Sequence, residues 1–317
     1  SAPAPVVVRS MEKAVEAGSK GKFEHFMQKE IHEQPETLRE AMRGRLIADQ
    51  GTACFHGIER SPEELRQWET LIFTGCGTSF NAALAGEYII EFLSRVPVEC
   101  EIASEFRYRN SPLEMGTAVF ALSQSGETAD TLAAMREIKR RGAPTFGICN
   151  NPFSTISRES DGGIDLRAGQ EVGVAATKSF TSQVLVLTML GLMLGRMRDL
   201  RHTEGKKILS ALEKLPDLVA ETLEVDEVVR RIAKKYAASE SFLFLGRQAN
   251  FPVALEGALK LQEISYISTC AHPSAELKHG VIALVNESTP SIFIAPRDEL
   301  FEKNLSNIEE VRARKGP

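Results

Sequence analysis

The sequence predicts an α/β protein made of two tandem parallel sheets with helices on both faces, the second of them incomplete. Short apolar strands alternate with helical patterns between about residues 69 and 170, which is the order typical of a parallel sheet. Two of these strands run directly into glycine-rich or hydroxyl-rich turns that open helices. A shift of 171 residues lays a second, shorter copy of this pattern on the first.

The chain begins with a polar segment, 1–45, that we expect to form a lead-in arm with linker helices. Its apolar residues recur at helical spacing and a proline is expected to start a second helix; these residues are Phe23, Phe26, Met27, Ile31 and Pro35. The apolar run near the amino end, 6–8, is far too short for a secretory signal. We therefore place the first sheet unit after the arm, at 46–200.

The first unit contains five expected strands and three expected helices. The strands are Leu71–Thr74, Val98–Ile102, Val119–Leu122, Thr145–Cys149 and Gly163–Leu166. The helices are Asn81–Leu93, Ala129–Arg141 and a long one over about Thr177–Met197. Charged helices over 201–238 lead to the second unit, 239–317, which opens with a strand at Phe242–Leu245 and is truncated.

Composition limits the class of protein. A chain of 317 residues with 43% hydrophobic and 26% charged residues is typical of a folded globular protein. A net charge of −5 argues against nucleic-acid or anionic-membrane partners. The longest apolar run, Val184–Leu194, is shorter than the roughly 20 residues that span a bilayer, so we expect a buried helix there.

The cysteines and histidines suggest neither a metal site nor a disulfide framework. Five cysteines show no C-x-x-C spacing and no metal-ligand pattern, which favours a reducing, cytoplasmic setting. We expect no cofactor.

The turn after the strand that ends at Leu122 is the strongest signal for a binding site. Helix N-termini present free N–H groups and a favourable dipole to anions, and the hydroxyls here add further donors. A phosphate monoester could be held in this way without a lysine. The other interpretation is an ordinary capping box, because Ser125 and Thr128 are common cap residues and Glu127 suits a first turn. The donors that we assign to the phosphate are Ser123, Gln124, Ser125 and Thr128.

A second turn, 75–79, follows the strand at Leu71–Thr74 and also favours a phosphate-binding pocket. Gly75 and Gly77 allow close backbone approach, and Thr78 and Ser79 supply hydroxyls. Cys76 sits between the two glycines. A thiol at a helix start can be a nucleophile, but no histidine lies near it in sequence, so we interpret Cys76 as a small turn residue.

The two copies differ in the turn that follows the first strand of each, which is where a ligand would bind. The first carries Gly77-Thr78-Ser79, whereas the second carries Gln248-Ala249-Asn250 and lacks the hydroxyl pair, so we assign phosphate binding to the first copy. The helix after the second turn carries Glu256, Lys260 and Glu263 on one face. One interpretation is a solvated ion pair, worth about 0.2–0.5 kcal/mol. The other is a set of functional charged side chains on a helix that is otherwise buried.

A series of ordered motifs resembles a known family. The motifs are residues 26–35, 76–79, 101–109, 122–132, 171–178, 255–266, 276–280 and 306–314. From about residue 20 to its end, the chain resembles the isomerase half of the glutamine–fructose-6-phosphate aminotransferase family, which is built from two sugar isomerase (SIS) domains.

The resemblance implies a role for each matched residue. The sugar phosphate would be bound by the turn residues Cys76, Gly77, Thr78, Ser79, Ser123, Gln124, Ser125 and Thr128. Val174 and Ala176 would line the sugar, and Glu256 would also bind the substrate. Glu263 would move a proton between C1 and C2, with help from Lys260. His279, lent by the neighbouring subunit of a homodimer, would open the ring, a task that suits an imidazole.

The implied activity is conversion of fructose 6-phosphate and ammonia, derived from glutamine in the full enzyme, to glucosamine 6-phosphate. The alternative is a sugar-phosphate-binding module without turnover. We expect a fragment of the family protein, because no glutaminase domain precedes the arm and the second copy stops midway at Pro317. Departures from the family pattern are Ala176, Val281 and the segment 270–274.

Overall fold

The computed structural model describes residues 18–317. The apolar run at 6–8, which we judged too short for a secretory signal, lies outside the described residues. The first unit contains a five-stranded sheet, all parallel, in the order β4-β3-β5-β6-β7. Its strands are β3 (Thr70–Gly75), β4 (Val98–Ile102), β5 (Thr117–Ser123), β6 (Thr145–Cys149) and β7 (Gly163–Asp165). The predicted strands are confirmed to within two residues at most ends.

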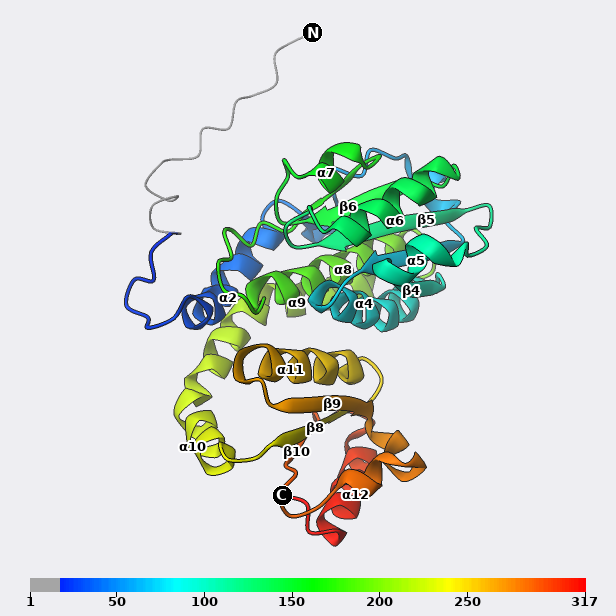
Figure 1. Cartoon of the computed structure of the whole chain (residues 1–317). Helices are drawn as coiled ribbons and strands as arrows, with labels where there is room; N and C mark the ends of the chain where they lie inside the picture. The colour runs from blue at the N-terminus through cyan, green and yellow to red at the C-terminus, as the bar shows by residue number, and fades with distance from the viewer. Residues whose placement is uncertain (1–17) are drawn as a thin grey trace.

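Helices cover both faces of this sheet, as Figure 1 shows. Alternate residues of a strand point to opposite faces, so β5 can bury both. Phe120 and Leu122 pack in the core with α4 (Thr78–Ser94) and α8 (Lys178–Arg196). Val119 packs on the other face with α5 (Ala103–Arg109) and α6 (Ala129–Arg140). This two-sided burial explains why the strands read as continuous apolar runs.

The helix α8 is the core of the first unit. Among residues 18–317 it is the one helix long and apolar enough to cross a membrane, yet 78% of its apolar 18-residue stretch is buried inside the fold. That burial is typical of a core helix, as expected for the run at Val184–Leu194. Gly86 of α4 lets the two helices approach closely, because a Cβ there would lie 2.6 Å from Leu187.

The lead-in segment differs from the expectation at Pro35. It forms one continuous helix, α2 (Phe26–Met42), with Pro35 inside it, and α2 packs beside α8 and α9 (His202–Thr222). A proline in a helix interior removes one N–H from the hydrogen-bond ladder. Here the Gln34 side chain donates to the Ile31 carbonyl at 2.9 Å in place of that N–H. The prediction that Pro35 starts a second helix is therefore wrong.

Shorter elements complete the first unit. An antiparallel ribbon pairs β1 (Leu46–Ile47) with β2 (Thr52–Ala53) across the 3-10 turn η1 (Ala48–Gln50). Two short helices, α3 (Pro62–Arg66) and α7 (Thr155–Glu159), begin at serine caps, Ser61 and Ser154, as helix starts commonly do.

The second unit repeats the first with fewer strands. Its parallel sheet has the order β10-β8-β9, from β8 (Ser241–Gly246), β9 (Ser268–Pro273) and β10 (Ser291–Ile294). A shift of 171 residues lays β8 on β3, β9 on β4 and β10 on β5. The order β10-β8-β9 therefore repeats the order β5-β3-β4 of the first sheet, and the internal repeat is confirmed. The helices are α10 (Asp226–Tyr236), α11 (Asn250–Ser265) and α12 (Phe301–Ala313), with 3-10 turns η2 (Leu223–Val225), η3 (Ser274–His279) and η4 (Val281–Leu284).

The helix α11 joins the two units. In Figure 1, α11 lies between the first unit and the second sheet. It packs on β8 and β9 with one side and on α4 with the other. α4 and α11 are equivalent helices of the two copies, and this contact places the start of α4 against the middle of α11, where Thr78 meets Glu256 and Lys260.

Candidate functional site

The two turns predicted to bind phosphate lie at the same edge of the first sheet. β3 and β5 are hydrogen-bonded neighbours, so their carboxyl ends are adjacent. The strands approach so closely there that a Cβ on Gly75 would lie 3.1 Å from the Leu122 carbonyl oxygen and 3.1 Å from the Ser79 Cβ. A larger residue at position 75 would be crowded for this reason. The carboxyl-end edge is also where open α/β sheets bind ligands.

The turn after β3 leaves donors free at the start of α4. The N-cap residue, Gly77, has a φ of +52° and offers no side-chain acceptor to the first-turn N–H groups. The buried Ser79 hydroxyl accepts a hydrogen bond from Gln183 Nε2 at 2.9 Å. Gln183 belongs to α8, so the core helix holds the serine oxygen in place while its proton is left to donate.

The turn after β5 uses two hydroxyls for its own shape and presents a third. Ser123 Oγ accepts from the Gly126 N–H at 3.0 Å and lies 2.8 Å from Thr128 Oγ1. Gly126 has a φ of +69°, which favours glycine. Ser125 is exposed and accepts from the Glu127 N–H at 3.1 Å, so its proton is free to donate outward.

The charged face of α11 contacts the first turn directly. Thr78 Oγ1 donates to Glu256 Oε1 at 2.9 Å and accepts from Lys260 Nζ at 2.9 Å. Asn81 Nδ2 donates to the other oxygen of Glu256 at 2.8 Å. Of the two sequence interpretations, the solvated ion pair is therefore wrong, because Glu256 is buried between the two units.

Lys260 compensates both carboxylates of this face. Its Nζ lies 3.3 Å from Glu256 Oε1 and 2.6 Å from Glu263 Oε2. The second distance is that of an ion pair, although its angles are not those of a hydrogen bond. The Glu263 side chain is about one-third exposed, although its Oε2, which faces Lys260, is itself buried, whereas the Glu256 side chain is buried as a whole.

A long loop, 166–177, runs past the same edge and carries Val174 and Ala176. Asn150, at the end of β6, ties the loop to the turn after β5. Its N–H donates to the Gln124 carbonyl at 3.1 Å, and its side chain bonds both Ala168 N–H at 2.8 Å and Gly169 carbonyl at 2.5 Å. Val174 is 94% exposed at the tip of this loop.

His279 and Cys76 stand apart from this cluster. His279 is exposed at the end of η3, and within the part of the chain that the structure describes no contact joins it to Glu263 or Lys260. Cys76 is half-buried, with its sulfur 3.9 Å from Thr131 Oγ1, and packs with the core under α5 and α6.

Three site residues escaped the sequence reasoning: Asn81, Asn150 and Gln183. Asn150 follows the carboxyl end of β6 as Ser123 follows β5, and that position could have identified it. Asn81 lies one helical turn after Gly77 and so shares the face of the phosphate turn. Nothing local distinguishes Gln183, which is a polar residue within an apolar helix.

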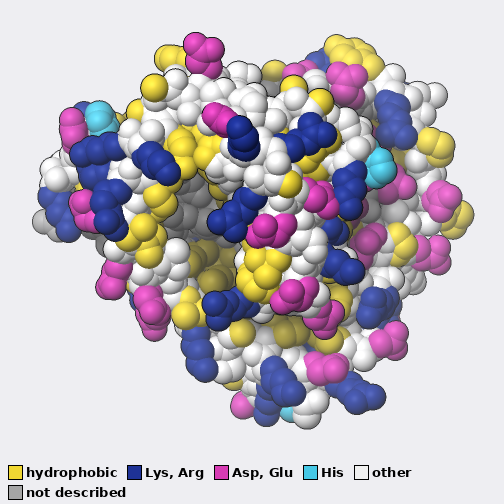
Figure 2. Space-filling model, turned by 90° about the horizontal axis from the view of Figure 1, so that it is seen from below, with side chains coloured by type: hydrophobic (Ala, Val, Ile, Leu, Met, Phe, Trp, Pro, Cys, Tyr) yellow, Lys and Arg dark blue, Asp and Glu magenta, His cyan; other side chains and the backbone are white. Residues whose placement is uncertain are grey.

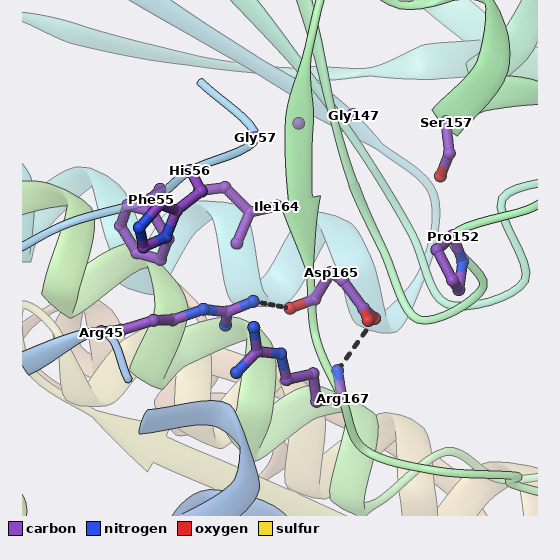
Figure 3. A pocket seen from close by; sticks show the side chains of 11 residues that line it. Arg45, Phe55, His56, Gly57, Gly147, Pro152, Ser157, Ile164, Asp165 and Arg167 are labelled. Atoms are coloured by element: carbon purple, nitrogen blue, oxygen red, sulfur yellow. Dashed lines mark hydrogen bonds between the residues drawn. The ribbon is translucent and has the colours of Figure 1, made fainter. Parts of the chain in front are cut away.

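Two hollows accompany the site. One of about 420 Å³ lies where α4 meets α11 and β9, lined by Gly77, Asn81, Leu255, Leu259 and Thr269 among others. The other, of about 260 Å³, lies beside β7 and is shown in Figure 3. There Arg45 donates to the Asp165 carbonyl at 2.6 Å, and burial lowers the pKa of Arg45 to about 10. None of the sequence-predicted site residues lines this second hollow.

The chain carries a formal net charge of −5. On the face drawn in Figure 2, basic and acidic side chains are intermixed over the surface, with apolar patches between them. An anionic ligand must therefore be held by local donors, such as the free N–H groups and hydroxyls of the two turns.

The duplicated parallel sheet with hydroxyl-bearing turns defines a class of sugar-isomerase-like folds. The chain belongs to the SIS domain family, which matches residues 64–193 and 235–317. In particular, it is similar to glutamine–fructose-6-phosphate aminotransferase [isomerizing] of Chlorobaculum tepidum, with 51% identity over 309 residues, 98% of this chain and 50% of the relative. It is 44% identical over 303 residues to the Thermus thermophilus protein of that name, covering 95% of this chain and 50% of the relative.

A solved structure gives the same result. The C-terminal domain of glucosamine-fructose-6-phosphate aminotransferase from Francisella tularensis matches with a TM-score of 0.90 and 40% identity, over 94% of this chain and 83% of that chain. The glucosamine-6-phosphate deaminase of Thermotoga maritima, at 24% identity and a TM-score of 0.73, shares the fold. The chain spans about half the length of the curated relatives it matches.

Proposed function

We propose that this chain is the isomerase half of a glucosamine-6-phosphate synthase, with fructose 6-phosphate as its substrate. The observation that carries the proposal is the contact of Thr78 with both Glu256 and Lys260. It joins the helix with the acid–base groups to the turn that would hold the phosphate. The similarity to aminotransferases that act on fructose 6-phosphate supports the same substrate.

In this proposal the phosphate is bound by neutral donors. The free N–H groups at the starts of α4 and α6 face the monoester, and the dipoles of both helices favour its charge. The hydroxyls of Ser79 and Ser125 donate to it, while Ser123 and Thr128 hold the second turn in shape. Thr78 contributes through its backbone, because its hydroxyl proton is already donated to Glu256.

The chemistry then follows in three steps. His279 of a second subunit moves the proton that opens the furanose ring, and ammonia replaces the C2 carbonyl oxygen, which leaves as water. The Glu263 carboxylate removes a proton from C1 and returns it to C2, which gives glucosamine 6-phosphate. Lys260 stands 2.6 Å from that carboxylate and holds it in position. Glutamine would supply the ammonia through the other half of a full enzyme.

The same proposal includes the setting of the protein. We infer a homodimer in the cytoplasm, with His279 lent across the interface and with neither nucleic acid nor membrane as a partner. The exposed position of His279 supports this arrangement. We place the arm at 1–45, the first SIS unit at 46–200, the connecting helices at 201–238 and the second unit at 239–317.

Binding is tested by calorimetric titration of the chain with fructose 6-phosphate, with fructose as the phosphate-free control. We expect Ser79→Ala and Ser125→Ala each to weaken binding of the phosphorylated sugar about tenfold to a hundredfold, the value of one hydrogen bond to a charged group. Ser268→Ala, at the opposite, exposed end of β9, is the matched control and should bind as the wild type does. Equal affinity for fructose would remove the phosphate assignment.

Proton transfer is tested by incubating the chain with fructose 6-phosphate in D₂O. Glu263 should exchange the C1 proton with solvent deuterium, which proton NMR detects. Glu263→Gln should lose this exchange and keep ligand affinity, whereas the exposed Glu302→Gln should retain both. Binding without exchange in the wild type would contradict the catalytic assignment and favour a binding module without turnover.

A further inference from the structure

A buried carboxylate outside the sheet unit binds the backbone of the loop 166–177. Glu30 of α2 is only 2% exposed. Its Oε1 accepts from the Val172 N–H at 2.6 Å and from the Gly173 N–H at 3.1 Å, and its Oε2 lies 3.2 Å from the same Gly173 nitrogen. Hydrogen bonds to an ionised acceptor are among the stronger ones in proteins. The loop is therefore fixed immediately before the residues that the proposed function assigns to the sugar.

The sequence around position 173 fits this contact. Gly173 has an ordinary backbone conformation, so a left-handed turn does not explain the glycine. A Cβ at this position would lie 2.5 Å from Glu30 Oε2 and 3.4 Å from the Met27 backbone. The glycine is needed because the carboxylate and the helix behind it come so close.

Separate groups hold the two ends of the loop. Asn150 bonds its beginning at Ala168 and Gly169. Glu171 Oε1 accepts from the Thr177 and Ser179 N–H groups at 2.9 and 3.3 Å, which ties the loop to the start of α8. Between these anchors, residues 172 and 173 are held by Glu30 alone among the described side-chain hydrogen bonds.

A second ion pair attaches the same helix to the end of the loop. Lys178, the first residue of α8, is 3% exposed and its Nζ lies 2.7 Å from Glu33 Oε2. Glu30 and Glu33 are one helical turn apart and lie on the same side of α2. The lead-in helix thus contacts the loop backbone and the beginning of the helix that follows it.

We propose that Glu30 is a positioning residue that sets the location of the sugar-lining backbone around Val174 and Ala176 relative to the two phosphate turns. This inference rests on the proposed function, since it assumes that the loop faces a sugar. It assigns to α2 a part in substrate selection beyond linking one region of the chain to another. The phosphate itself is bound elsewhere, by the turns after β3 and β5, so loss of Glu30 should affect the sugar and spare the phosphate.

The test compares two ligands on one set of variants. Calorimetry measures the Kd of fructose 6-phosphate and of inorganic phosphate for the wild type, Glu30→Leu, Glu30→Gln and the control Glu36→Gln, which is exposed on the same helix. We expect Glu30→Leu to raise the Kd of the sugar phosphate at least about tenfold and that of phosphate less than about twofold. Glu30→Gln keeps an oxygen at the Oε1 position and should show an intermediate effect.

Hydrogen exchange gives a second readout that needs no ligand. The amides of Val172 and Gly173 should lose protection in Glu30→Leu, while the amides of α8 keep theirs. Gly173→Ala, which crowds the Glu30 carboxylate while every residue of α2 stays unchanged, should reproduce the selective loss of sugar-phosphate affinity. This variant keeps the test decisive if Glu30→Leu does not fold.

Two outcomes have different meanings. A wild-type chain that binds neither ligand contradicts the proposed function. A wild-type chain that binds fructose 6-phosphate, together with variants in which both Kd values change equally or not at all, leaves the function intact and overturns the positioning role of Glu30.

Discussion

Glu256 is the residue on which the junction of the two units depends. It is buried and accepts from Thr78 and Asn81 while it faces Lys260. Removing one member of a buried polar cluster leaves its partners unsatisfied, which costs more than the hydrogen bonds themselves contribute.

We therefore expect Glu256→Ala to lower the free energy of unfolding by about 3 kcal/mol. Urea denaturation followed by circular dichroism measures this change. The exposed Glu302→Ala on α12 should cost less than about 0.5 kcal/mol. A loss for Glu256→Ala as small as that of the control would show that the buried cluster contributes little.

Gly126 lies in the turn after β5, where both the backbone conformation and the space favour glycine. Its φ is +69°, and a Cβ there would lie 2.0 Å from Ser154 Oγ. Gly142 has a φ of +89°, and a Cβ there would have no atom within 4 Å. An alanine at position 142 would therefore meet the backbone strain without a steric clash. We expect Gly142→Ala to cost about 1–2 kcal/mol and Gly126→Ala about 1–3 kcal/mol more.

Urea titration of both variants separates the two terms. Gly126→Ala should also weaken phosphate binding, because a backbone shift that relieves the clash would disturb the hydrogen bond from the N–H of residue 126 to Ser123. Equal costs for the two substitutions would show that the turn has room for a methyl group.

At the scale of the element, α2 shows how a helix tolerates an internal proline. The Gln34 amide supplies the hydrogen bond that Pro35 cannot give to the Ile31 carbonyl. Gln34→Ala should lower the free energy of unfolding by about 1 kcal/mol, the value of one such bond. In a Pro35→Ala background the backbone N–H returns, and Gln34→Ala should then cost close to nothing. A double-mutant cycle measured by thermal unfolding gives the coupling, and additive costs would contradict this account.

The outer face of α4 provides a pH-dependent prediction. Partial burial, with a smaller contribution from the charges of Glu91 and Glu99, raises the pKa of Glu87 above its ordinary value of 4.5. The folded state therefore favours the protonated form, and this contribution to stability is present below pH 4.5 and lost as pH rises through the folded pKa. Glu87→Gln should stabilise the protein at pH 7.

The gain should be less than about 1 kcal/mol, because the group is half exposed, and should vanish near pH 4. Melting temperatures of wild type and variant at the two pH values measure it, with Glu302→Gln as the control for loss of one charge. A gain that is equal at both pH values would show that burial does not raise the pKa of Glu87.

The elements that were predictable are those whose signals are local. Strands such as Phe242–Leu245 are specified by adjacent residues, and their structure agrees with the prediction. The turn after β3 is shorter than predicted, because α4 begins at Thr78, three residues before the expected start at Asn81. Pro35 was misread because the compensating group is a side chain, which backbone propensities ignore. Glu30, Asn150 and Gln183 act on segments that lie 18 to 143 residues away in sequence, so no local pattern could indicate their partners.

At the scale of the whole molecule, the sequence indicated two units but not how they meet. The repeat identified α4 and α11 as equivalent helices, and the charged residues on one face of α11 indicated a functional role for that face. The contact of Glu256 with Thr78, 178 residues apart, follows only from the packing of one unit on the other. The site at this junction thus depends on an interface that helical periodicity cannot describe.

The proposed homodimer can be tested by subunit mixing. Glu263→Gln and His279→Ala chains should each be inactive in the deuterium-exchange assay. If His279 serves the neighbouring site, one site of each mixed dimer has both intact groups, and an equimolar mixture should recover about a quarter of wild-type activity. A mixture that stays inactive would show that His279 acts within its own chain or not at all.

The packing of α11 on α4 also has a consequence for the origin of the molecule. Corresponding surfaces that contact each other are the rule in symmetric dimers of identical subunits. A single ancestral unit that paired through this helix would already have placed one subunit's helix against the other subunit's anion-binding bend. Fusion of the two genes would then have released the second bend, now Gln248-Ala249-Asn250, from binding an anion, and its helix could then acquire the base that we propose.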